Sequence, residues 1–134
     1  MSAYDISSSI AYDSAFNTAA IATDTTTNGE IIDTLGYQSL DFAVLSGTLT
    51  DGAYTITLED GDAANLSDAS TVASTSLVGS LPAFADTEDN TVKHVGYVGK
   101  KRYVRLSIVS TSTSSGGTFS AIALKGNAAS RPTS

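Results

Sequence analysis

The chain of 134 residues has no cysteine and no tryptophan, and it contains only two prolines, one histidine and one methionine. The absence of cysteine excludes disulfides and thiolate metal sites. No apolar run approaches the roughly 18 residues that a membrane-spanning helix needs. The first residues, MSAYDISSSIAYDS, have neither a basic start nor an apolar stretch, so they do not resemble a secretory signal. We therefore expect a soluble protein, made in the cytoplasm, without a membrane partner.

Strong helix formers are also scarce, because leucine, lysine and glutamate are few. In their place stand 20 serines and 18 threonines, over a quarter of the chain. Threonine, valine and tyrosine favour strands because their side chains pack well on a pleated surface. The length suits a single domain. The composition therefore predicts one all-β domain with small, polar outer surfaces.

The clearest strand follows the turn dipeptide Asp51-Gly52, where Tyr54, Ile56 and Leu58 alternate with polar residues. In the stretch QSLDFAVLS, by contrast, both alternating faces carry apolar residues. A further turn dipeptide, Asn28-Gly29, predicts a hairpin turn because both residues tolerate positive φ. About eight short strands are expected, at 17–22, 30–34, 38–46, 53–59, 71–78, 91–98, 101–110 and 118–124. This spacing predicts an antiparallel β-sandwich, either jelly-roll or Greek-key-like.

The domain organisation follows from the same pattern. Residues 1–16 keep to neither the strand nor the helix period, and we interpret them as an irregular arm that lies on a neighbouring surface. The alternative is a first edge strand of the same domain. Residues 17–126 form the sandwich, with 79–90 as a long loop, and residues 127–134 form a mobile tail. The arm's spaced apolar residues are candidate contacts with another subunit: Tyr4, Ile6, Ile10 and Tyr12.

The charges are partitioned along the chain. All fourteen acidic residues lie between Asp5 and Asp89, and all seven basic residues lie between Lys93 and Arg131. Two explanations stay open. Either the charges pair across neighbouring strands, or a basic edge meets the acidic edge of another copy. The second makes the basic cluster a candidate interface, formed by Lys100, Lys101, Arg102 and Arg105.

Nucleic acid is not the expected partner of this basic cluster, because a net charge of −7 repels a polyanion. Catalytic chemistry is not expected either. His94, the only histidine, has no nucleophile or orienting carboxylate that the sequence places beside it. Asp60, Asp62 and Asp68 are weak candidates for a cation site, but their spacing does not fit a calcium loop. We expect a non-enzymatic protein without a metal or another cofactor.

Two blocks of the sequence are distinctive as strings, although they are not chemical motifs. The first is residues 33–62, DTLGYQSLDFAVLSGTLTDGAYTITLEDGD. The second is residues 89–127, which includes VGYVGKKRYVRL and STSTSSGGTFSAIALKG. Together they cover about half of the chain. In their order, these blocks resemble a family of small head proteins from tailed bacteriophages.

This resemblance implies a capsid decoration, or cement, protein: a β-rich, non-enzymatic subunit that binds the outside of the phage head and stabilises its lattice. The implied partners are the major capsid protein and further copies of the chain, as a homotrimer. The implied location is the capsid surface of the virion, after synthesis in the host bacterial cytoplasm. The alternative is a receptor- or glycan-binding β-sandwich module of a phage head or tail fibre. That function would need exposed aromatic side chains on which sugars can stack.

Overall fold

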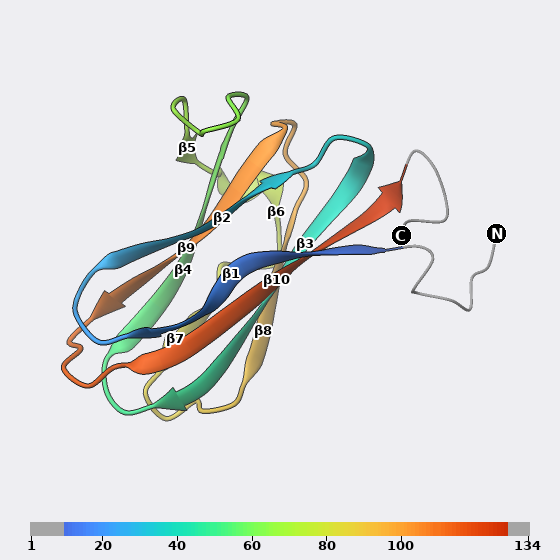
Figure 1. Ribbon diagram of the computed structural model, residues 1–134. Helices are drawn as coiled ribbons and strands as arrows, with labels where there is room; N and C mark the ends of the chain where they lie inside the picture. The colour runs from blue at the N-terminus through green and yellow to red at the C-terminus, as the bar shows by residue number, and fades with distance from the viewer. Residues whose placement is uncertain (1–9, 129–134) are drawn as a thin grey trace.

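The structure is a computed structural model that describes residues 10–128, and side chains up to Gly126. Ten strands and one short 3-10 helix, η1, make up the described chain (Figure 1). In order they are β1 (Ala11–Ile21), β2 (Thr26–Asp33), β3 (Tyr37–Leu49), β4 (Ala53–Gly61), β5 (Ser70–Thr71), η1 (Ser74–Ser76), β6 (Leu77–Val78), β7 (Ala83–Ala85), β8 (Val92–Tyr97), β9 (Tyr103–Thr111) and β10 (Gly117–Ala128).

The strands form two antiparallel sheets that pack face to face. Sheet A has the order β1-β10-β3-β8-β6, and sheet B has the order β2-β9-β4-β5, with β7 also paired to β4. Without the short strands β5, β6 and β7, the orders β1-β10-β3-β8 and β2-β9-β4 alternate early and late strands, as in a jelly roll. The predicted all-β sandwich is therefore confirmed. The strands number ten instead of about eight, and β3, with 13 residues, is not short.

The core lies between the two sheets and follows the strand alternation. Tyr54, Ile56 and Leu58 of β4 are buried, as predicted. The Phe119 ring lies at its centre, 4.7 Å from the Tyr54 ring and 5.3 Å from the Phe84 ring between centroids. These three rings join β4, β7 and β10. Because aromatic pairs add to the free energy of apolar burial, this cluster ties the two sheets together.

Two expectations about the chain's ends need correction. Residues 11–16 are not an irregular arm, because they form the first half of β1 and pair with Ala121–Lys125 of β10 on one side only. The edge-strand alternative is right for this stretch, since Ala15 and Phe16 are buried in the core. Tyr4 and Ile6 lie outside the described residues. At the other end, β10 continues to Ala128, beyond the expected end of the strand.

The Asn28-Gly29 dipeptide is not a hairpin turn, because it lies inside β2. The pairing of β2 with β9 shifts register between Asn28 and Ile31. A Cβ at Gly29 would overlap the carbonyl oxygen of Ala15 and lie 2.6 Å from that of Leu106. The glycine is therefore required by the close approach of three backbones rather than by positive φ.

The expected strand at 71–78 is also wrong as one element. It is divided into the end of β5, the helix η1 and the two-residue β6. Along these segments the chain crosses from sheet B to sheet A, because β5 pairs with β4 and β6 pairs with β8. The loop expected at 79–90 contains the short strand β7. A chain that crosses between sheets cannot keep one strand period, which is why the pattern misled here.

Candidate interaction surfaces

The jelly-roll order explains the partition of charge. Strands β8, β9 and β10 come from the basic third of the chain, and each lies between two strands from the acidic part. Every described lysine and arginine except Lys100 forms an ion pair with an acidic side chain before residue 90. Of the two explanations left open by the sequence, pairing within the chain accounts for these residues.

On sheet B, Arg105 of β9 stands opposite Glu59 of β4 in the strand register. Its Nη2 donates to Glu59 Oε1 at 2.7 Å, and the arginine side chain is 19% exposed. On sheet A, Lys125 of β10 lies 2.6 Å from Asp13 of β1, and its Nζ sits 4.8 Å from the centre of the Tyr37 ring. These pairs fix neighbouring strands to each other and leave little free charge on them.

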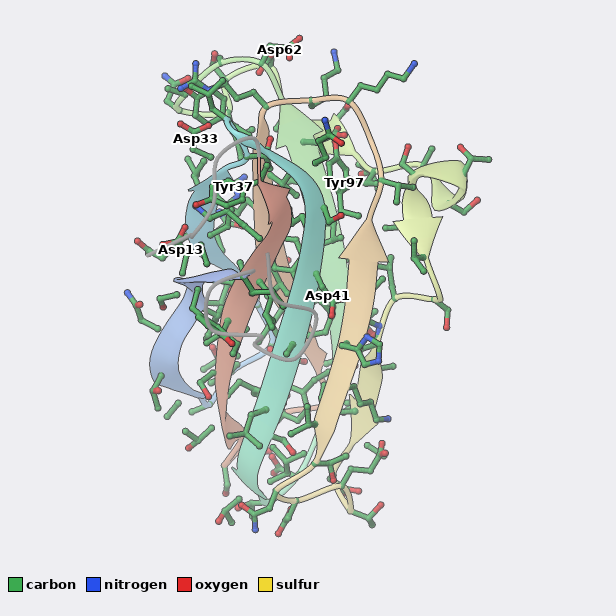
Figure 2. The ribbon with its side chains drawn as sticks, turned by 90° about the vertical axis from the view of Figure 1, so that its right-hand side faces the viewer. Asp13, Asp33, Tyr37, Asp41, Asp62 and Tyr97 are labelled. Carbon is green, nitrogen blue, oxygen red and sulfur yellow. The ribbon has the colours of Figure 1, made fainter. Side chains whose placement is uncertain are left out.

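Two further pairs, Arg102–Asp33 and Lys101–Asp62, lie at one end of the sandwich, where Figure 2 shows Asp33 and Asp62. Arg102 donates two hydrogen bonds to the Asp33 carboxylate, each 2.8 Å long. The Arg102 hydrogen bond lowers the pKa of Asp33 to about 2, with a further contribution from the Leu35 N–H. Asp33 is therefore charged throughout the neutral range, and its charge is directed at the same chain.

The three acids proposed as weak cation ligands are already engaged. Asp68 accepts the backbone N–H groups of Asp62 and Ala63, which lowers its pKa. Asp62 pairs with Lys101 at 3.1 Å, and Asp60 accepts the Tyr97 hydroxyl at 2.6 Å. Burial and the Asp60 hydrogen bond raise the pKa of that tyrosine. Within residues 10–128, no group of three or more acidic or histidine side chains is arranged to hold a metal ion.

The predicted interface residues therefore have different environments. Lys101, Arg102 and Arg105 face acids of the same chain, whereas Lys100 is exposed and has no ion-pair partner among the described residues. Ile10 is half-buried just before β1. Contact of any of these residues with another subunit stays a prediction.

Tyr12 belongs to a larger feature that we call the sheet A face, the outward surface of β1, β10, β3 and β8. Tyr12 is 55% exposed and stands opposite Leu124 of β10 in the strand register. The described chain has eight exposed large apolar side chains, and six of them lie on sheet A or directly after β8: Tyr12, Leu45, Val78, Val92, Val98 and Ile122.

Two shallow grooves cross the sheet A face. One, of about 210 Å³, is lined by Ala43, Leu45, Val92 and Ile122 among others. The other, of about 300 Å³, includes Val78, Gly96 and Val98. Asp41 and His94 also line this second groove, with Asp41 Oδ1 3.5 Å from His94 Nδ1 and both side chains well exposed. Figure 2 shows Asp41 on β3 near the middle of the sheet, far from the charged end.

The sheet A residues other than Tyr12 were missed as an interface, although the sequence carried a signal. In β3, Leu40, Phe42 and Val44 are buried, yet the opposite face of the strand carries Ala43 and Leu45. Apolar residues on both faces indicate a strand that is covered on both sides or that presents an apolar surface. The pattern alone does not distinguish these cases.

The end opposite the charged cluster is held by backbone contacts. The Asp51 carboxylate accepts the N–H groups of Ser114, Ser115 and Gly116, the shortest at 2.8 Å, and these bonds lower the pKa of Asp51. The β3–β4 turn is thereby tied to the β9–β10 loop. Hydrogen bonds and ion pairs therefore hold the loops together at both ends of the sandwich. Such contacts make the sandwich a rigid support for its outer faces.

Comparisons with known proteins place the fold but no family. No protein-family model matches the chain, and no curated protein matches its sequence. A chain in a solved structure of infectious bursal disease virus, Gx strain, is structurally similar, with a TM-score of 0.50 and 13% sequence identity. The match covers 92% of this chain and 34% of that chain, so this protein spans about a third of its structural neighbour. The described residues contain no helix of the length and hydropathy that crossing a bilayer requires. What the comparison establishes is that this chain shares a β-sandwich fold with a chain in a virus structure.

Proposed function

We propose that this chain is a structural protein of a virus particle, specifically a decoration protein that binds the outside of a tailed-phage head and stabilises its lattice. The observation that carries the proposal is the sheet A face, where aliphatic side chains are exposed on a jelly-roll sandwich whose ends are held by polar contacts. Exposed apolar patches mark protein contact surfaces. The fold likeness to a chain in a virus structure supports the same class, because jelly rolls recur in viral capsids.

The chemistry of the described residues also supports a binding role without catalysis. The clustered carboxylates accept backbone or side-chain hydrogen bonds, and the lone His94 faces Asp41 on an open strand surface. A general base needs a positioned substrate proton and usually an orienting partner in a cleft. We therefore propose a non-enzymatic protein that needs no cofactor and binds protein rather than nucleic acid.

Jelly rolls also occur in lectins, so glycan binding is the competing function. Sugars stack on exposed aromatic rings, and the described tyrosines offer few. Tyr54 and Tyr97 are buried. Cationic groups lie over the rings of Tyr37 and Tyr103, at 4.8 and 4.9 Å. Tyr12 alone, among the described tyrosines, is exposed, which does not favour a glycan platform.

The direct experiment uses phage heads that lack the protein. Purified protein is added to them, bound and free protein are separated by sedimentation, and head disruption is followed on heating. We expect saturable binding and a higher disruption temperature, because a ligand that binds only the assembled lattice stabilises it. Heads that bind none of the protein, or binding of labelled protein to host cells instead, would contradict the proposal.

A further inference from the structure

We infer that the sheet A face is a two-fold contact between two copies of this chain. The inference goes beyond the proposed decoration role, because it assigns the apolar surface to a second copy of the chain and not to the head. It concerns the free protein and does not need a capsid to be tested. Three observations carry it: the charges on the face, the absence of an excess of one sign, and the size of the face.

The first observation is the position of the charges. Among the described residues that point outward from β3, β8 and β10, Asp41 and His94 are the ionisable ones apart from tyrosine, and they lie 3.5 Å apart. A two-fold axis lying in the plane of the contact can place Asp41 of one copy over His94 of the other, and the reverse contact then forms by symmetry. The acidic Asp41 and the neighbouring basic His94 are thus complementary to the same two residues of the symmetry-related copy.

The second observation is the low charge of the face, which favours a second copy of this chain over a partner of opposite charge. Interfaces with charged partners carry complementary potentials, with an excess of one sign on each side. The sheet A face carries one acid and one histidine, in a chain whose net charge is −7. A two-fold contact that sets each Asp41 over an imidazole keeps the two carboxylates from facing each other. Aliphatic side chains surround the central pair, as in the charge-poor centre of protein interfaces.

The third observation is size. Strands β1, β10 and β3 have 11, 12 and 13 residues, and β8 completes the broad part of the sheet. At about 4.8 Å between strands and about 3.3 Å per residue, this face has a flat area on the order of 600 Å² before side chains are counted. Stable interfaces bury about 600–1,000 Å² on each partner. The flat area of the face therefore reaches the lower end of the area that a stable dimer buries.

The experiment exchanges the two charges in separate variants. In Asp41→Lys both central groups are basic, and in His94→Asp both are acidic, so neither homodimer can set an acidic group over a basic one. An equimolar mixture restores two attractive contacts, Lys over Asp and His over Asp. By analytical ultracentrifugation we expect a wild-type dimer, at least about tenfold weaker association of each variant alone, and recovery of the dimer in the mixture.

A second set of variants removes ambiguity about folding. Leu45→Asp is expected to give a monomer with the wild-type circular dichroism spectrum, because Leu45 is 45% exposed and faces away from the core. The matched control, Thr57→Asp, places the same charge on the outward face of sheet B and leaves the dimer intact. Wild-type protein that stays monomeric, a trimer without a two-fold axis, a dimer indifferent to Leu45→Asp, or a mixture that does not recover would each overturn the inference.

The outcomes for the two proposals are separable. Protein that dimerises through sheet A but does not bind phage heads keeps this inference and defeats the proposed decoration role. Protein that binds heads as a monomer, with Leu45→Asp abolishing the binding, assigns the face to the capsid and overturns the dimer.

Discussion

The two outer faces of the sandwich are built on similar strands and yet differ in character. On sheet B, the outward residues of β4 and β9 include Thr57, Glu59, Arg105 and Ser107. Arg105 donates a hydrogen bond to Glu59, and Ser107 donates one of 2.8 Å to Asn28 of β2. Sheet A presents aliphatic side chains with one exposed Asp41–His94 pair. A polar face of this kind is suited to water, although Arg105 Nε is buried without a hydrogen-bond partner. An apolar face, by contrast, gains free energy when another surface covers it.

The largest expected effect is a difference in the free energy of unfolding between substitutions on the inner and outer sides of β10, a strand of sheet A. Phe119 of β10 is 1% exposed, and Ile122 on the other side is 45% exposed. Phe119→Ala is expected to lower the free energy of unfolding by about 3–5 kcal/mol, because it empties the centre of the core. Ile122→Ala is expected to change it by less than about 0.5 kcal/mol in dilute protein. Urea unfolding at low concentration measures both, and equal losses would mean that Ile122 supports the fold rather than a contact.

A smaller effect is expected at the centre of the sheet B face. Arg105→Met keeps the apolar stem but removes the donor to Glu59, whose side chain is 32% exposed. We expect a loss of about 1–3 kcal/mol, as for hydrogen bonds to charged groups. Adding Glu59→Gln to Arg105→Met should recover part of that loss, because no unpaired carboxylate then remains. Chemical denaturation of the four proteins gives the coupling, and additive losses would argue against an Arg105–Glu59 interaction.

The smallest effect concerns the charged end, where β2 of sheet B finishes at Asp33. The pKa of Asp33 is lowered from 3.8 to about 2, mainly by the Arg102 hydrogen bond. A lowered folded-state pKa stabilises the fold above pH 4, and this contribution is lost as the pH falls from about 4 to about 2. NMR titration should show the Asp33 pKa rising toward 3.8 in Arg102→Gln. The matched control Lys100→Gln should leave it unchanged, and an unshifted Asp33 in Arg102→Gln would refute the assignment.

How much of this could be predicted is clearest in β4 and β2. The period of two in β4 identified Tyr54, Ile56 and Leu58 as core, and all three are buried, because one face of β4 meets the core and the other is polar. In β2, the Asn28-Gly29 dipeptide suggested a turn, but Gly29 instead accommodates the backbones of β1 and β9. Turn propensity is local, whereas the need for a missing Cβ arises from residues that are distant in sequence.

The sequence by itself determined the class of structure: β-rich composition, alternating side chains and turn dipeptides require a sandwich with a buried inner layer. It also fixed the division of charge along the chain. Tertiary structure alone decided that those charges pair internally, because only the strand order sets Arg105 beside Glu59 and Lys125 beside Asp13. It also gathered Leu45, Val92 and Ile122 onto one open face. Residues from three separate strands become a surface only when hydrogen bonding between those strands puts them in register.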